Sequence, residues 1–369
     1  MSPPDSTEVI SAGVAAGLDA VGVARAERFG SVRAELVRHR DQGLHGGMAF
    51  TYRNPDRSTD PGRVVDGARS LVVGALGYRR PTPVRPDRAV GRVAAYARRD
   101  HYGALRQALG QVAAMLVAAG YEAVVVADDN ALVDREAARR AGLGWYGKNS
   151  NILLPGRGSW FVLGTVVTTA ELVPSDPVPD QCGPCRRCLE SCPTGAIIAP
   201  GVVDARRCLA WLVQAGGDFP LEYREALGNR IYGCDDCQEV CPPNRLLEDA
   251  GEDASVGTAS GSEEDMAWGS VAGGVSSGSE EEMAWVDLVE LLGLDDDRLM
   301  DRYGRWYIPR REPRYVRRNA LVALGNSGRG DDPEVVATVV RYLADADPML
   351  VRHAVWAARR LGVDAAVPA

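Results

Sequence analysis

Eight cysteines gathered in one short stretch constrain this 369-residue chain more than any other feature. The first four are separated by two, two and three residues, and a proline follows the fourth; they are Cys182, Cys185, Cys188 and Cys192. The remaining four are Cys208, Cys234, Cys237 and Cys241, and a proline again follows the last. Thiols this crowded either bind metal or form disulfides, and either bond fixes the fold of the segment that carries them.

The first spacing is the run of bacterial ferredoxins, in which three cysteines bind one 4Fe–4S cluster and the fourth binds a second cluster. Eight thiolates supply four ligands to each of two clusters. The crossover predicts one set of Cys182, Cys185, Cys188 and Cys241 and another of Cys192, Cys208, Cys234 and Cys237. The alternative is structural zinc, which also binds four thiolates but rarely in this run. Two neighbouring clusters form a relay for single electrons and imply a redox centre at one end.

The start of the chain predicts no export. Its first thirty residues contain four acidic residues, no basic cluster and no uninterrupted apolar stretch, so a secretory signal is not expected. No run approaches the roughly 18 apolar residues of a membrane helix. We therefore expect a cytoplasmic monomer without membrane contact, in a reducing compartment that favours metal binding by cysteines.

Helical and strand-like patterns alternate through the first half of the chain and indicate an α/β or α+β layered domain over residues 1–175. Helices are predicted near 6–18, 33–40, 102–119 and 134–143, and strands near 20–24, 70–78, 122–127 and 159–169. The cysteines mark a ferredoxin-like domain over residues 176–247.

An acidic, low-complexity insert follows over residues 248–287. Eleven residues there are acidic and none is basic, and SGSEEDMAW recurs as SGSEEEMAW with a 17-residue period. This composition favours disorder. We interpret the insert as a linker; the alternative is a docking motif that presents methionine and tryptophan twice.

The last segment, residues 288–369, contains two similar apolar helices, Val316–Gly328 and Val351–Gly362, spaced 35 residues apart. Such spacing is typical of HEAT-like helical hairpins. The formal net charge of −8 argues against a nucleic-acid partner, but leaving out the eleven acidic residues of the insert changes it to +3. Eight arginines lie between Arg302 and Arg329, against one acidic residue, Glu312. They form either a solvated helix face or a nucleic-acid contact surface, for which Arg310, Arg314 and Arg317 are the candidates.

Four segments carry a specific resemblance: AGLGWYGKNSNILLPGRGSWFVLG (141–164), CGPCRRCLESCPTGAI (182–197), GNRIYGCDDCQEVCPPN (228–244) and VRRNALVALGN. They resemble epoxyqueuosine reductase. The resemblance implies an α+β protein with a cobalamin-binding α/β catalytic domain, a ferredoxin-like module with two 4Fe–4S clusters, and C-terminal α-helical HEAT-like repeats. Members of that family reduce epoxyqueuosine to queuosine at the wobble position of tRNA.

The resemblance also implies site residues. The family's catalytic acid falls on Asp128, with Asp129 beside it as the alternative. Further expected cobalamin contacts are Arg57, Asp134, Lys148, Asn149, Ser150, Ile152, Asp235 and Asp236. Lys148 is the only lysine in the chain; it contacts the corrin or a phosphate, or else pairs with a carboxylate. The alternative role of Asp134 is to cap the following helix. One departure from the family pattern is the order Asp100-His101-Tyr102.

The implied chemistry needs two electrons and two protons for each epoxide opened. The clusters would pass low-potential electrons to cobalamin, and a buried carboxyl could donate a proton. The implied partners are a tRNA with a queuosine-type anticodon stem-loop and a low-potential donor such as a flavodoxin or ferredoxin. The alternatives are a corrinoid reductive dehalogenase, a ferredoxin-like electron carrier and a scaffold with structural clusters.

Overall fold

The computed structural model describes residues 4–79, 81–249 and 283–363. Most of the expected acidic insert, including the duplicated segments up to residue 282, lies outside the described residues. Among the described helices, none has the length and apolar character needed to cross a membrane.

The N-terminal part of the chain is built on a four-stranded sheet in the order β1-β2-β7-β4. Its strands are β1 (Ala20–Arg25), β2 (Ser70–Gly77), β7 (Phe161–Thr168) and β4 (Ala123–Ala127). All three pairings are antiparallel, so the α+β alternative is the one found. The first six residues of β2 are buried, as its apolar run predicts.

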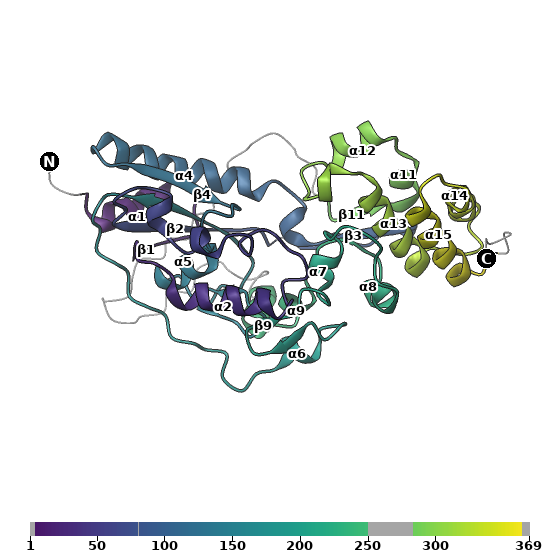
Figure 1. Cartoon of the computed structure of the whole chain (residues 1–369), viewed down its shortest axis with the longest axis horizontal. Coiled ribbons are helices and arrows are strands. Elements are labelled where there is room, and N and C mark those ends of the chain that lie inside the picture. The colour runs from purple at the N-terminus through teal and green to yellow at the C-terminus, as the bar shows by residue number, and fades with distance from the viewer. Residues whose placement is uncertain (1–3, 80, 250–282, 364–369) are drawn as a thin grey trace.

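Helices cover both faces of this sheet, as Figure 1 shows. α1 (Ser6–Ala15) and α4 (His101–Ala118) share a core with one face, and α5 (Asp134–Arg140) shares a core with the other. α4 turns Leu105, Leu109, Val112 and Leu116 to the sheet, the spacing of an amphipathic helix. α2 (Gly30–Asp41) leads to a loop in which the Leu44 carbonyl accepts a hydrogen bond from the backbone of Ala205.

The cysteine-rich module consists of short elements joined by turns. They are α6 (Arg187–Glu190), β8 (Ile197–Ala199), β9 (Val202–Val203), α7 (Leu209–Leu212), α8 (Arg224–Leu227), α9 (Asp236–Glu239) and α10 (Pro242–Asp249). Such short helices bury little apolar surface, so the module depends on its neighbours and on metal for stability.

A second sheet joins three distant parts of the chain. Strand β3 (Val90–Val93) pairs in parallel with β10 (Arg230–Tyr232) and antiparallel with β11 (Trp285–Asp287). β11 falls inside the range expected for the acidic insert, so the end of that range is folded. The sequence analysis did not predict this sheet.

The C-terminal helices form a separate layer at one end of the molecule (Figure 1). They are α11 (Leu288–Gly293), α12 (Asp296–Tyr303), α13 (Arg314–Ser327), α14 (Pro333–Leu343) and α15 (Pro348–Leu361). α13 and α15 are the two helices expected from the repeat. They pack closely at Gly325, where a Cβ would lie 2.9 Å from the Cα of Ala357. Asp332 and Asp347 cap α14 and α15 as the acidic helix starts predict.

Candidate active site and cluster sites

The loop that follows β4 carries the expected catalytic acid. Asp128 has a φ of 52°, in the left-handed region that few residues other than glycine adopt. Strain of this kind gathers at functional sites, where the surrounding structure holds it in place. The neighbouring Asp129 uses its carboxylate inside the loop, because Oδ1 accepts a hydrogen bond from Ala131 N at 2.8 Å. The geometry therefore favours Asp128 over Asp129 as the free carboxyl.

Asp128 and Asp134 form a pair of carboxyls with raised pKa values. Desolvation raises the pKa of Asp128; the Arg106 guanidinium opposes this rise and Asp129 adds to it. Burial and the nearby Asp128 hold the pKa of Asp134 well above its usual range. Oδ1 of Asp134 is buried and has no hydrogen-bond partner among the described residues. Both carboxyls therefore favour the protonated form more than an exposed aspartate does.

Three partly or fully buried tyrosines, Tyr96, Tyr102 and Tyr232, have raised pKa values. Burial raises the pKa of Tyr102, and Asp128 and Asp134 raise it further. Tyr96 and Tyr232 have ring centroids 6.3 Å apart, and their pKa values are also raised by burial. Asp128 adds to the rise at Tyr232, which places that ring near the acid. Sequence reasoning missed these tyrosines; the altered order at Asp100-His101-Tyr102 was the one available signal.

The Gly-Lys-Asn-Ser motif forms the turn between β5 (Trp145–Tyr146) and β6 (Ile152–Leu153). Ser150 has a φ of 66°, and its Oγ donates to the Gly201 carbonyl at 2.7 Å. Arg135, from α5, donates to the Ser150 carbonyl at 2.7 Å. This turn is thereby fixed to the helix that carries Asp134. Ile152 is only 4% exposed, and its side chain packs in the core that α5 shares with the sheet.

Lys148 and Asn149 form hydrogen bonds to the cysteine-rich module. The Lys148 ammonium donates to the carbonyls of Gly183 and Cys185, at 2.6 and 2.9 Å. Asn149 Nδ2 donates to the Cys237 carbonyl at 3.2 Å. The motif therefore holds two cysteine loops against the catalytic domain. Lys148 forms no ion pair with a carboxylate among the described residues, and its expected contact to the corrin or a phosphate stays a prediction.

Arg57 lies in the one-turn helix α3 (Pro55–Ser58), which Asn54 caps through a hydrogen bond to Arg57 N. Its side chain is exposed and forms no ion pair within the described part of the chain. An exposed guanidinium suits the phosphate or amide groups of cobalamin. The unpaired Oδ1 of Asp134 suits an amide donor of the same cofactor. These residues fit the expected group.

The eight thiols fall into two neighbouring groups. Burial raises the pKa of Cys241 to about 11, and Cys188, Cys182 and Cys185 raise it further, which places them near Cys241; we call these four the first thiol set. Burial holds the pKa of Cys237 well above its usual range, with Cys234, Cys208 and Cys192 as its strongest neighbours; these form the second thiol set. Cys188 also influences Cys237, so the two sets are adjacent. Each set brings together four partly or fully buried thiols, the number of thiolate ligands that one 4Fe–4S cluster needs.

A small cavity lies at the first thiol set. It is lined by Gly147, Lys148, Asn149, Leu153, Cys182, Cys185, Arg187, Cys188, Cys241 and Pro242. Within the described residues, no three His, Cys, Asp or Glu side chains converge on a single ion. A cubane does not require such convergence, because each cysteine binds a different iron.

Asp235 and Asp236 separate in space although they are adjacent in sequence. Asp235 is 4% exposed, and its Oδ2 accepts a hydrogen bond from Ala95 N at 2.8 Å. Burial raises its pKa to about 6, and Oδ1 has no partner among the described residues. Asp236 instead binds Arg230 through both oxygens, at 2.6 and 2.7 Å. Asp235 therefore faces the catalytic domain, whereas Asp236 stays within the cysteine-rich module.

The three arginines expected to contact nucleic acid have different environments. Arg310 is 78% exposed and has a φ of 50°. Arg314 binds Glu312 and Asp347. Arg317 is 12% exposed and forms an ion pair with Asp296, so its guanidinium is occupied within the protein.

Comparisons with known proteins agree with this arrangement. A family described as a 4Fe-4S double cluster binding domain matches residues 181–244, and HEAT repeats match residues 307–369. An epoxyqueuosine reductase of Vibrio cholerae is 32% identical over 350 residues, which cover 90% of this chain and 87% of that protein. One of Bacillus anthracis is 36% identical over 248 residues, 65% of each chain. The aligned part thus spans about two thirds of that relative's length.

A solved structure of an epoxyqueuosine reductase bound to an epoxyqueuosine-modified tRNA-Tyr stem loop superposes with a TM-score of 0.81. It is 28% identical, and the match covers 96% of this chain and 90% of that one. The match therefore includes the layered domain, the cysteine-rich module and the helical repeats together. This chain belongs to the epoxyqueuosine reductase family, a family of oxidoreductases.

Proposed function

We propose that this protein reduces epoxyqueuosine to queuosine in tRNA, with cobalamin and two 4Fe–4S clusters as cofactors and Asp128 as proton donor. One observation carries the proposal: two four-thiol sets and a carboxyl pair with raised pKa values are linked through buried tyrosines in one chain. The relatives named epoxyqueuosine reductase support it. An electron carrier without its own substrate would have no use for the carboxyl pair.

The reaction opens an epoxide and removes its oxygen as water, which consumes two electrons and two protons. Bound cobalamin supplies the metal-centred reducing chemistry. Desolvation raises the pKa of Asp128, which favours the protonated form that a proton donor needs. Asp128 also raises the pKa of Asp134, so the two carboxyls titrate as a coupled pair. Tyr102 covers both carboxyls and helps to exclude water.

We assign the first thiol set to one cluster and the second thiol set to the other. Asn149 and Lys148 fix the two cysteine loops to the catalytic domain, which keeps the distance for electron transfer constant. Arg57, Ser150 and Asp235 are the proposed contacts of cobalamin.

Arg310 is the proposed contact to the RNA backbone. Tyr307 lies close by in the chain and is 59% exposed, which suits stacking against an unpaired base. The substrate would be a tRNA stem loop, which the protein would meet in the cytoplasm.

The test uses anaerobically reconstituted full-length protein with cobalamin and epoxyqueuosine-containing tRNA. We expect about eight irons per chain and turnover with a low-potential reductant. Asp128→Asn should bind cobalamin but lower kcat by about 10²–10⁴-fold. Asp129→Asn is the matched control and should stay within a few fold of the wild type. Unchanged turnover in Asp128→Asn would remove Asp128 from the mechanism.

A further inference from the structure

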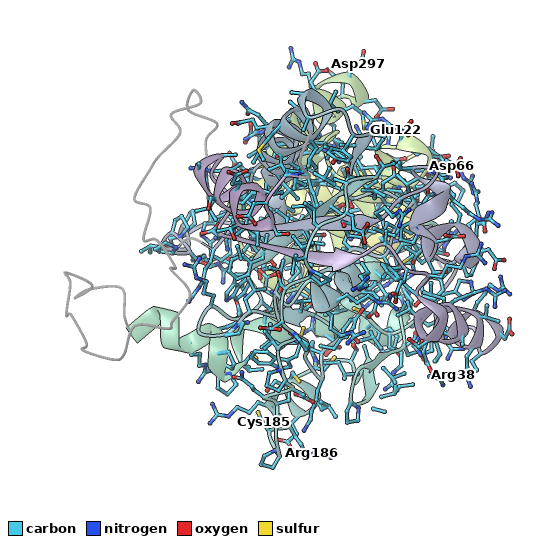
Figure 2. The ribbon with its side chains drawn as sticks, turned by 90° about the vertical axis from the view of Figure 1, so that its left-hand side faces the viewer. Arg38, Asp66, Glu122, Cys185, Arg186 and Asp297 are labelled. Carbon is cyan, nitrogen blue, oxygen red and sulfur yellow. The ribbon has the colours of Figure 1, made fainter. Side chains whose placement is uncertain are left out.

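The two thiol sets differ in how their surroundings meet solvent. Around the first set, Gly183, Pro184, Arg186 and Arg187 are exposed. Figure 2 shows Cys185 and Arg186 at one extremity of the molecule. Around the second set, Gly233, Asp235 and Gln238 are buried. The loop that carries Cys182 and Cys185 therefore lies nearer to the surface than the segment that carries Cys234 and Cys237.

Neighbouring groups lead from this surface through the second thiol set toward the acid site. Helix α6, which carries Cys188 of the first set, packs against α9, which carries Cys237 of the second set. Asp235, between two cysteines of the second set, contacts the backbone of Ala95, beside Tyr96. Tyr96 and Tyr102 both pack against the core that α4 shares with the four-stranded sheet. The first set is the end of this series that a protein in solution can approach most closely.

A shallow, open depression lies at the first thiol set. We call it the cysteine rim; it is lined by Pro184, Cys185, Arg186, Arg187, Glu190 and Pro242. Arg186 is 65% exposed and faces Glu190 at 3.7 Å, a pair that solvent screens strongly. Arg187 also lines the neighbouring cavity, together with Lys148. The charged residues that line the two hollows are three cations and one anion, so this lining carries a net positive charge. Asp180, which accepts a hydrogen bond from Cys182 N, lies outside it.

We propose that the cysteine rim is the docking surface for a small acidic one-electron carrier protein. The inference rests on the proposed function and adds where its electron donor binds. Guanidinium groups bind carboxylates through two parallel hydrogen bonds, and exposed charges speed the encounter of opposite surfaces. Each docking event oxidises the carrier by one electron and reduces the first cluster by one. Two such events supply the two electrons of one epoxide reduction.

The experiment uses reconstituted full-length protein and a reduced flavodoxin with net negative charge as the probe. Stopped-flow absorbance follows cluster reduction at several salt concentrations, and a titration gives the Kd of the complex. The variant Arg186→Glu/Arg187→Glu should lower the rate and the affinity by about tenfold at low salt, with the difference vanishing at high salt. Glu190→Arg adds positive charge and should raise both.

The matched control is Arg298→Glu/Arg329→Glu. These arginines are 77% and 73% exposed, and each pairs with a nearby carboxylate far from the cysteines in the sequence. The proposal is overturned if the clusters of both rim variants are reduced at the wild-type rate. It is also overturned if Arg298→Glu/Arg329→Glu slows cluster reduction as much as Arg186→Glu/Arg187→Glu does. Iron content is measured for every variant, and the opposite sign expected for Glu190→Arg cannot arise from damage to a cluster.

A chemical reductant separates this inference from the proposed function. Titanium(III) citrate reaches the clusters without a protein interface, so wild-type turnover with it reports on the reaction alone. A protein that accepts electrons from flavodoxin at the rim but leaves epoxyqueuosine unchanged under both reductants would refute the proposed function and leave the docking surface in place.

Discussion

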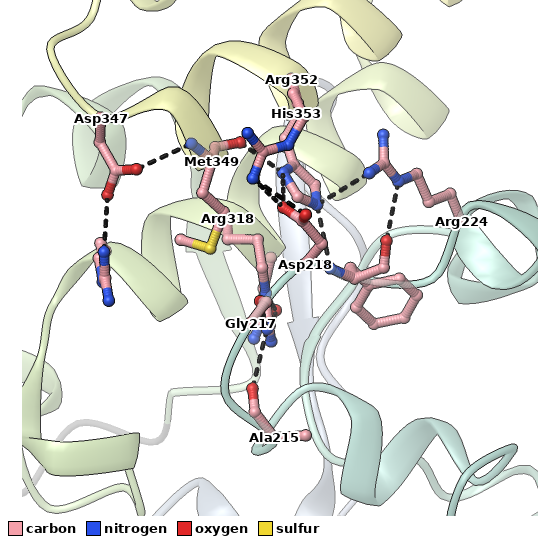
Figure 3. A network of polar contacts seen from close by, with 12 residues as sticks. Ala215, Gly217, Asp218, Arg224, Arg318, Asp347, Met349, Arg352 and His353 are labelled. Atoms are coloured by element: carbon pink, nitrogen blue, oxygen red, sulfur yellow. Dashed lines mark hydrogen bonds and ion pairs between the residues drawn. The ribbon is translucent and has the colours of Figure 1, made fainter.

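Arg318 is fully buried in α13, and its guanidinium joins the helical repeats to the cysteine-rich module (Figure 3). It donates to the carbonyls of Leu212, Ala215 and Gly217, at 3.0, 2.8 and 2.5 Å. No carboxylate pairs with it among the described residues. These carbonyls lie just beyond α7, the helix that begins after Cys208 of the second thiol set. Replacing Arg318 therefore tests whether the repeats support a cluster.

The magnitude follows from the bonds that Arg318→Met would remove. Three carbonyls would lose their donor: that of Leu212 is buried, and those of Ala215 and Gly217 are partly buried. An unsatisfied buried group costs about 1–3 kcal/mol. Methionine offsets part of this because it avoids the burial of an unpaired charge. The net loss in the free energy of unfolding should be about 3 kcal/mol, a large share of the roughly 5–15 kcal/mol of a typical protein.

Urea unfolding of the apoprotein and the reconstituted protein, with iron content, provides the assay. We expect Arg318→Met to lose stability and to lose iron from the second cluster first. Arg329→Met is the control, since Arg329 is 73% exposed and its replacement should change stability by less than about 0.5 kcal/mol. A loss below about 1 kcal/mol for Arg318→Met, or unchanged iron retention, would refute the reasoning.

Three further predictions concern the thiol sets and two buried titratable groups. Cys182→Ala/Cys241→Ala removes two ligands of one set and should leave about four irons, whereas Cys182→Ala/Cys192→Ala damages both sets and should leave almost none; the reverse result would contradict the crossover. Burial raises the pKa of Asp134, so the wild type loses stability as pH rises above about 4 toward that raised value. The free energy of unfolding of Asp134→Asn relative to the wild type, measured with urea, should therefore be higher at pH 8 than at pH 5. A difference between the two proteins that does not change with pH would contradict a raised pKa of Asp134. Burial lowers the pKa of His353 to about 4, so the wild type loses stability as pH falls below the unfolded value of about 6.5. The loss should be about 2 kcal/mol between pH 7 and pH 5 and should be absent in His353→Gln; an equal loss in both proteins would exclude His353.

The parts that the sequence predicted well are those with local signals. The cysteine spacing predicts both thiol sets, and the repeat spacing predicts α13 and α15. Asp128 could be placed because the acid and the helix after it lie in one continuous segment. The other groups depend on contacts between distant segments. Lys148 binds carbonyls 35 and 37 residues away, for which no pattern in the chain provides a sign.

The arginine-rich segment shows the same limit of prediction from sequence. Arg317 and Arg318 were counted with the candidate RNA contacts because composition alone cannot tell an internal arginine from an exposed one. In the structure Arg318 lies in the interior, since its partners come from the turn after α7, about a hundred residues earlier. The strands β3 and β11 were missed for a similar reason: each has at most four residues, and neither is stable without its distant partner.

The small sheet of β10, β3 and β11 makes the three parts of the chain mutually dependent during assembly. β3 emerges before the cysteines, β10 emerges among them, and β11 emerges last. Until β11 is synthesised, one edge of β3 stays unpaired and open to association with other chains. The same property offers a use: two fragments divided between residues 250 and 282 would each carry part of this sheet, and the pairing of β11 with β3 would direct their recombination into one enzyme.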